Sequence, residues 1–168
     1  GGKAMIEAYE AGTAPAFELY GLSLEHKHVP ELQKYGNLDQ RPIFVPSVGN
    51  FRQGMLVSVP LHLDALNGKP KAADLEAVLV ERYRNAELVR VISSQDLSVK
   101  AGRIEPEALN DTDQLELRVY GNEARRQAVL VARLDNLGKG AAGQAVQNAN
   151  IMFGFEASLG LSVQGIGI

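Results

Sequence analysis

The 168-residue sequence contains no cysteine. Without cysteine the chain can supply no disulfide, no thiolate metal ligand and no cysteine nucleophile. It also lacks an apolar run of the roughly 20 residues that a membrane-spanning helix needs, and its N-terminus has no signal-peptide pattern. We therefore expect a cytoplasmic protein that has no membrane partner.

An excess of positive charge is also lacking, because 17 Lys and Arg residues stand against 20 Asp and Glu residues, for a formal net charge of -3. The basic residues are scattered, so the electrostatic footprint of a nucleic-acid-binding protein is missing. Hydrophobic residues make up 45% of the chain and charged residues 22%, which is close to average globular composition. We expect a single globular domain over residues 1–168 and no nucleic-acid partner.

Hydrophobic periodicity predicts the order of helices and strands. A polar, irregular stretch at 93–114 is expected to extend over a site or a partner, and Gly121-Asn122-Glu123 is expected to turn a hairpin. This order indicates an α+β fold with a mostly antiparallel, mixed sheet covered by helices. The predicted helices lie at 5–9, from 29, within 70–85 and at 139–153, and the predicted strands at 17–24, 42–48, 55–63, 88–92, 115–120 and 128–134.

Two histidines and a glutamate form the motif with the clearest chemical potential. On an extended segment His26 and His28 point the same way, and Glu31 can return toward them from the following turn. Such a group can move a proton near neutral pH, because free histidine has a pKa of about 6.5. Two alternatives stay open: an exposed loop without function, and an open zinc or iron site made of two His and one Glu. By contrast, His62 stands alone in a predicted strand, where a packed or surface role is expected.

Three blocks in a fixed order give the sequence a specific resemblance. They are residues 26–31 (HKHVPE), 46–54 (PSVGNFRQG) and 135–150 (DNLGKGAAGQAVQNAN). The chain thereby resembles N-acetyl-gamma-glutamyl-phosphate reductases from Gly1 to about Phe155. Its Gly1-Gly2-Lys3 start is similar to the segment that follows the catalytic cysteine in that family. The resemblance implies that a nucleotide-binding Rossmann domain carrying the cysteine precedes this chain.

The resemblance implies an activity and assigns roles to the motif residues. The family reduces N-acetyl-gamma-glutamyl phosphate to N-acetyl-glutamate 5-semialdehyde with NADPH, releasing phosphate, in arginine biosynthesis. His26 and His28 would share proton transfer and substrate orientation, and Glu31 would orient them, although spacing does not decide which histidine is the acid/base. Arg52 would bind the acyl phosphate substrate with help from Asn50, the alternative being a solvated loop arginine.

The resemblance also implies a cofactor, a fold and an assembly. Lys139, Gly140 and Gln144 would approach the nicotinamide of NADP, which the preceding domain would mainly bind, and the alternative for these small and polar residues is helix–sheet packing. The fold would be that of the C-terminal domains of glyceraldehyde-3-phosphate and aspartate-semialdehyde dehydrogenases. Such domains pair through their sheets, so we expect a homodimer or homotetramer even for this chain alone. The chain alone is then predicted to be inactive, and a non-catalytic oligomerisation or binding module is the alternative. The tail at 158–168 lies outside the three blocks and has no assigned role.

Overall fold

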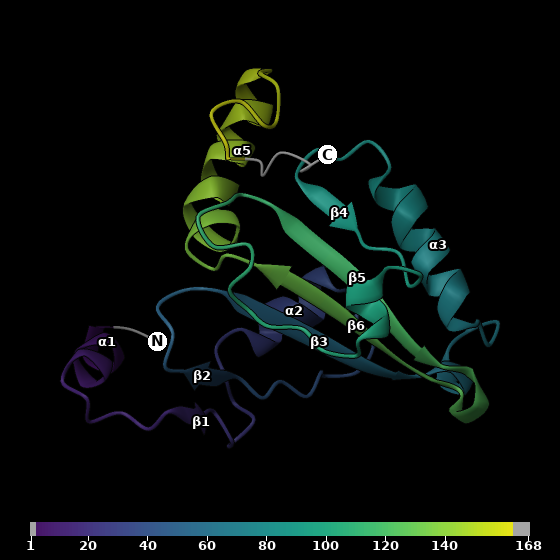
Figure 1. Ribbon diagram of the computed structural model, residues 1–168, viewed down its shortest axis with the longest axis horizontal. Helices are drawn as coiled ribbons and strands as arrows, with labels where there is room; N and C mark the ends of the chain where they lie inside the picture. The colour runs from purple at the N-terminus through teal and green to yellow at the C-terminus, as the bar shows by residue number, and fades with distance from the viewer. Residues whose placement is uncertain (1–2, 163–168) are drawn as a thin grey trace. The chain divides into compact units, whose positions relative to one another are not determined.

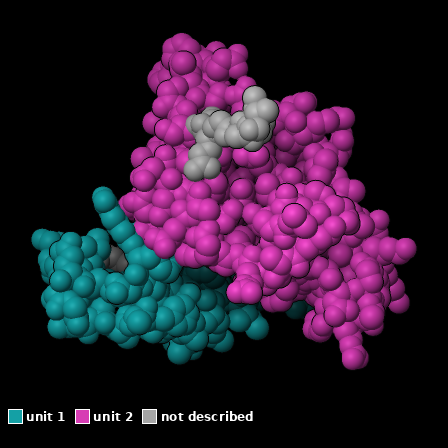
Figure 2. Space-filling view, viewed as in Figure 1, with its two compact units in different colours: residues 1–52 teal, residues 53–168 magenta. Residues whose placement is uncertain are grey.

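The computed structural model describes residues 3–162, and the chain forms two compact units, residues 1–52 and residues 53–168 (Figure 2). The first unit contains two helices and a two-stranded sheet, and the second contains a four-stranded sheet with its helices. The expectation of a single domain stays a prediction. No helix within residues 3–162 is long and apolar enough to cross a bilayer.

The strands of the first unit are much shorter than the sequence predicts. Strand β1 (Phe17–Leu19) pairs antiparallel with β2 (Ser47–Gly49), instead of the predicted strands at 17–24 and 42–48. The chain leaves β1 because Gly21 and Leu24 both adopt a positive φ of 62°, which extended backbone does not allow. Before β2, Pro46 accepts a hydrogen bond from Tyr20 N at 3.0 Å but has no N–H to return, so the ladder stops there.

The two helices of the first unit agree with their sequence patterns. Helix α1 (Lys3–Glu10) covers the predicted 5–9 segment. Helix α2 (Val29–Tyr35) has Pro30 in its first turn, where a missing N–H leaves no hydrogen bond unmade. Val29 is completely buried and anchors the start of α2.

The second unit is built on a sheet with the strand order β3-β6-β5-β4 (Figure 1). All neighbours pair antiparallel except β4 and β5, which confirms the predicted mixed, mostly antiparallel α+β fold. The predicted hairpin at 115–134 also forms, but its turn is the 3-10 turn Glu123–Arg125, and Gly121 and Asn122 still belong to a strand. The strands are β3 (Met55–His62), β4 (Val89–Val91), β5 (Leu115–Asn122) and β6 (Gln127–Leu134).

The apolar face of this sheet carries the predicted helix α3 (Ala72–Tyr83), which packs on β4 and β5 (Figure 1). Along β5, Val119 and Gly121 share one face because strand side chains alternate. Gly121 permits a close approach of the helix, since a Cβ atom built on it would lie 2.4 Å from the Cβ of Ala72. This helix and strand therefore fit only with glycine at position 121.

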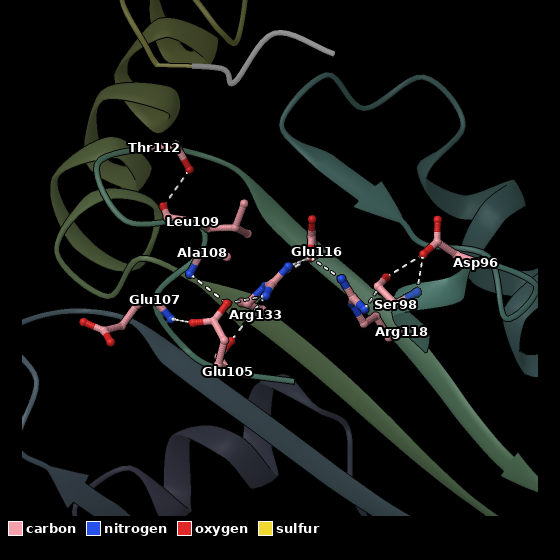
Figure 3. A network of polar contacts seen from close by, with 10 residues as sticks. All are labelled: Asp96, Ser98, Glu105, Glu107, Ala108, Leu109, Thr112, Glu116, Arg118 and Arg133. Carbon is pink, nitrogen blue, oxygen red and sulfur yellow. Dashed lines mark hydrogen bonds and ion pairs between the residues drawn. The ribbon is translucent and has the colours of Figure 1, made fainter. Parts of the chain in front are cut away.

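The opposite face of the sheet is polar, and the segment 93–114 covers it. The segment includes the short helix α4 (Leu97–Lys100) and buries Val99 and Leu109. Glu116 and Arg118 of β5 point to this face, where Arg118 Nη1 donates to Ser98 Oγ at 3.0 Å (Figure 3). The irregular stretch predicted at 93–114 thus packs on the chain's own sheet.

The last helix begins with an unusual turn. Residues Gly138–Ala142 form a π-helical turn that leads into α5 (Gly143–Phe153), so the helix predicted at 139–153 is confirmed with a different start. After α5 the tail folds back, and Ser162 and Asp113 exchange hydrogen bonds of 2.8 Å. The rest of the tail, residues 163–168, lies outside the described residues.

Candidate active site

His26 lies in the turn between β1 and α2, and its ring is surrounded by aromatic side chains. The ring centroids of Tyr20 and Phe44 lie 5.9 Å and 5.1 Å from that of His26, both in edge-on geometry. The Nδ1 atom of His26 accepts a hydrogen bond from the backbone N–H of His28 at 3.2 Å. Neutral His26 therefore carries its hydrogen on Nε2, where it can be donated to a ligand.

His28 has the opposite arrangement. It caps helix α2 with helical backbone angles, φ -81° and ψ -8°, and its Nδ1 lies 2.7 Å from Oε2 of Glu31. An ionised carboxylate only accepts hydrogen bonds, so neutral His28 carries its hydrogen on Nδ1 and its lone pair on Nε2. About half of the His28 side chain is exposed to solvent.

The structure brings His26, His28 and Glu31 together, but not on the extended segment that the sequence suggested. Helix α2 starts at Val29, so His28 already has helical angles, and the two rings converge across a turn with centroids 5.0 Å apart. One ring thus offers a fixed N–H donor, and the other offers a lone pair supported by a carboxylate. Proton transfer is the chemistry that this asymmetric pair can perform.

The metal-site alternative finds no support in this geometry. Within the described range, residues 3–162, no three His, Asp or Glu side chains are arranged to hold a metal ion. The Nδ1 atoms of His26 and His28 and the Glu31 carboxylate already bond within the group.

Asn50 and Arg52 lie just after β2 at the end of the first unit. The backbone N–H of Asn50 extends the β1–β2 pairing by donating to Ala16 O at 2.9 Å. Phe51 packs on Gly49, where an added Cβ would lie 2.6 Å from the Phe51 ring. This folding leaves the side chains of Asn50 and Arg52 exposed, and both can bind an anion from solution.

Lys139, Gly140 and Gln144 lie in the second unit, around the π-helical turn. Lys139 is buried, and its Nζ donates to Oε1 of Gln144 at 2.9 Å and to Oε1 of Gln147 at 2.5 Å. Burial lowers the pKa of Lys139, and the nearby charge of Asp113 opposes this shift. Lys139 and Gln144 therefore bind each other, whereas Gly140 is exposed.

Two buried polar groups were missed in the sequence. One is Asp135, which is only 1% exposed, and the other is the set of Glu116, Arg118 and Arg133 on the polar face of the sheet. Asp135-Asn136 before Gly138 is a pattern typical of a side-chain-capped turn, and this signal could have pointed to Asp135. The alternating Glu and Arg of β5 gave no signal of burial, because such a pattern is usual on exposed strands.

Comparison with known proteins identifies the family. Residues 1–136 match the family described as semialdehyde dehydrogenase, dimerisation domain. The chain is 50% identical over 159 residues to the N-acetyl-gamma-glutamyl-phosphate reductases of Brucella ovis, Brucella canis and Brucella melitensis, which confirms the resemblance seen in the sequence. These alignments cover 92% of this chain and 51% of each relative, so the chain spans about half the length of the curated relatives. The chain belongs to the semialdehyde dehydrogenase family, whose dimerisation domain it contains.

Proposed function

We propose that this chain is the C-terminal part of an NADPH-dependent N-acetyl-gamma-glutamyl-phosphate reductase and carries its proton-transfer group. The reaction would convert N-acetyl-gamma-glutamyl phosphate to N-acetyl-glutamate 5-semialdehyde and release phosphate, in arginine biosynthesis. The observation that carries the proposal is the 2.7 Å contact between His28 Nδ1 and Glu31 Oε2, which leaves Nε2 free to accept a proton. The proposal is further supported by 50% identity to reductases of that name.

In the first chemical step, His28 would act as the general base. Its Nε2 would take the proton of a cysteine thiol supplied by the N-terminal half that the relatives possess. The thiolate would attack the acyl carbon, and phosphate would leave with the electrons of the broken C–O bond, which gives a thioester. Glu31 would stabilise the imidazolium of His28 and keep its ring in place.

In the second step, the same proton would pass to the substrate. NADPH would supply the hydride for the acyl carbon of the thioester. His28 would give its Nε2 proton to the carbonyl oxygen to form a thiohemiacetal, and would take that proton back as the C–S bond breaks and the aldehyde forms. Because Nδ1 of His26 is occupied, its Nε2–H would donate a fixed hydrogen bond to the same oxygen.

The remaining candidate residues would bind substrate and cofactor. Arg52 and Asn50 would hold the phosphate or carboxylate groups of the substrate. Gly140 fits a place where NADP approaches the backbone, because it is exposed and has no side chain. Lys139 and Gln144 would act on the cofactor indirectly, since their side chains are bonded to each other and hold the turn.

The test is to join the N-terminal half of the Brucella ovis relative to this chain and to measure acyl-phosphate-dependent oxidation of NADPH. The joined protein should be active, and this chain alone should not. His28→Gln should lower kcat by about 10²–10⁴-fold, as expected for loss of a general acid/base, whereas Lys27→Gln, between the two histidines, should change little. An inactive but folded joined protein, NADPH turnover by this chain alone, or full activity of His28→Gln would contradict the proposal.

An assembly role is a second candidate, and one observation favours it. Strand β3 is an edge of the four-stranded sheet, and its Val57 and Val59 are 43% and 46% exposed. An exposed apolar edge strand is a surface on which a second copy can pair. We propose a homodimer or homotetramer, and a monomeric mass by light scattering at high protein concentration would contradict it.

A further inference from the structure

One buried carboxylate joins three segments of the second unit that are far apart in the sequence. Asp135 follows β6, and its Oδ1 accepts the N–H of Leu137 at 2.7 Å. Its Oδ2 accepts the N–H of Asp111 at 2.8 Å and Nε2 of Gln53 at 3.0 Å. Within residues 3–162 its charge is balanced by such neutral N–H donors, with no lysine or arginine contributing.

The neighbouring residues extend this arrangement. The Oδ1 atom of Asn136 accepts the N–H of Gly54 at 2.7 Å, and Nδ2 of Asn110 donates to the carbonyl of Gln53 at 3.2 Å. Gly54 has a φ of 109°, and a Cβ on it would lie 2.7 Å from the carbonyl oxygen of Pro106, so only glycine fits here. We call Gln53, Gly54, Asn110, Asp111, Asp135 and Asn136 the Asp135 cluster.

The two arms of the Asp135 cluster hold different segments of the second unit. On one side, the Asp135 carboxylate holds Gln53, which lies just before β3. On the other side, the carbonyl oxygen of Asp135 accepts the N–H of Gly140 at 2.8 Å. Asp135 thus holds the π-helical turn with its backbone and the Gln53 segment with its side chain.

The negative charge of Asp135 is essential to this arrangement. Burial by itself raises the pKa of Asp135, but the N–H groups of Leu137, Asp111, Gly138 and Gln53 together bring the pKa below its ordinary value. In an Asp135→Asn variant an NH₂ group would replace one of the two acceptor oxygens. A donor would then face a donor, which is the costly outcome for a buried polar group.

We propose that Asp135 is a positioning residue of the reductase site. Its carboxylate holds the start of the Gly140 turn, through the N–H of Leu137, and the Gln53 segment in one fixed arrangement. This inference rests on the proposed function, because it gives the Gly140 turn a catalytic purpose. It differs from simple stabilisation, since it requires these two segments to loosen together when the charge is removed.

Hydrogen exchange on this chain tests the positioning without any activity. In Asp135→Asn, the amides of Gly54, Asp111 and Leu137 should exchange about tenfold faster or more, as expected for losing hydrogen bonds to a charged group. The amides of Arg118 and Val131, in the middle of the sheet, should keep their rates. Unchanged rates at the cluster, or an equal increase everywhere, would overturn the proposal. Asp39→Asn, at an exposed position of the first unit, is the matched control.

A milder variant covers the case in which Asp135→Asn does not fold. Gln53→Met keeps the length of the side chain but removes its donation to Asp135 and to Asp111 Oδ1, which lies 2.9 Å from Gln53 Nε2. It should speed exchange at Gly54 and Asp111 and leave Leu137 protected. Faster exchange at Leu137 alone would overturn the proposed connectivity.

Kinetics of the joined protein then test the catalytic purpose. Asp135→Asn should lower kcat and raise KM for NADPH, each by about tenfold or more, because the turn that carries Gly140 is displaced. His28→Gln should lower kcat alone. If the unsubstituted joined protein is inactive, the proposed function fails while hydrogen exchange still decides the positioning. If the unsubstituted joined protein is active and its Asp135→Asn variant has the same kcat and KM, the positioning role is overturned.

Discussion

Replacing Glu116 with glutamine should strongly destabilise the second unit, because this carboxylate serves two buried arginines (Figure 3). Its Oε2 accepts hydrogen bonds from Nη2 and Nε of Arg133, at 2.6 Å and 3.1 Å, and from Nη2 of Arg118, at 3.1 Å. Glu116, Arg118 and Arg133 are 8%, 5% and 9% exposed. In the variant, two guanidinium groups would stay buried without this charge.

The expected loss follows from the partners that remain. Arg133 still contacts Glu105 Oε1 at 2.9 Å, but that side chain is 57% exposed. Within the described part of the chain, Arg118 keeps a hydrogen bond to the hydroxyl of Ser98 and the charge of the exposed Asp96 nearby. Removing one partner of a buried ion pair costs about 3–5 kcal/mol. Because glutamine still accepts one hydrogen bond, we expect a loss of about 3 kcal/mol, which corresponds to a fall in Tm of roughly 6–12 °C for a chain of this length.

Urea unfolding followed by circular dichroism measures this loss as a lower midpoint with an unchanged m value. Glu107→Gln, in the exposed part of the same segment, is the control and should stay within about 0.5 kcal/mol of the parent. The double variant Glu116→Gln with Arg118→Gln should recover part of the loss, since it removes one uncompensated charge. A loss below about 1 kcal/mol in Glu116→Gln would refute the reasoning, because it would mean that water already screens these charges.

Two further predictions concern the acid stability of the chain and the packing of α3. Because the pKa of Asp135 is lowered in the folded state, its contribution is complete above the unfolded pKa of about 3.9 and is lost as the pH falls through the folded pKa. The free energy of unfolding of Asp135→Asn, measured against pH, should therefore fall less steeply below about pH 4 than that of the parent. Parallel curves for the parent and the variant would contradict this. Gly121→Ala should cost about 1–3 kcal/mol in urea unfolding, because the new Cβ would lie 2.4 Å from that of Ala72. Adding Ala72→Gly should restore most of the stability. A Gly121→Ala variant that is as stable as the parent would contradict the close packing.

The sequence predicts the second unit well and the first unit poorly, and local physics explains the difference. Alternating apolar residues and helical spacing correctly located β3, β5, β6 and α3, because each element is long enough to show its period. In the first unit, two residues with positive φ and a proline shortened both predicted strands, and a single leucine in a left-handed conformation, Leu24, carries no sequence signal.

The spacing of His26, His28 and Glu31 and the blocks around them were enough to select these residues as the candidate proton-transfer group. Which ring nitrogen carries the hydrogen depends on tertiary structure, because the hydrogen bonds that fix the two tautomers form across the turn entering α2. The buried Asp135 is also a result of tertiary structure. Its donors at positions 53 and 111 come from segments that local patterns cannot bring together, since their meeting depends on the path of the whole chain.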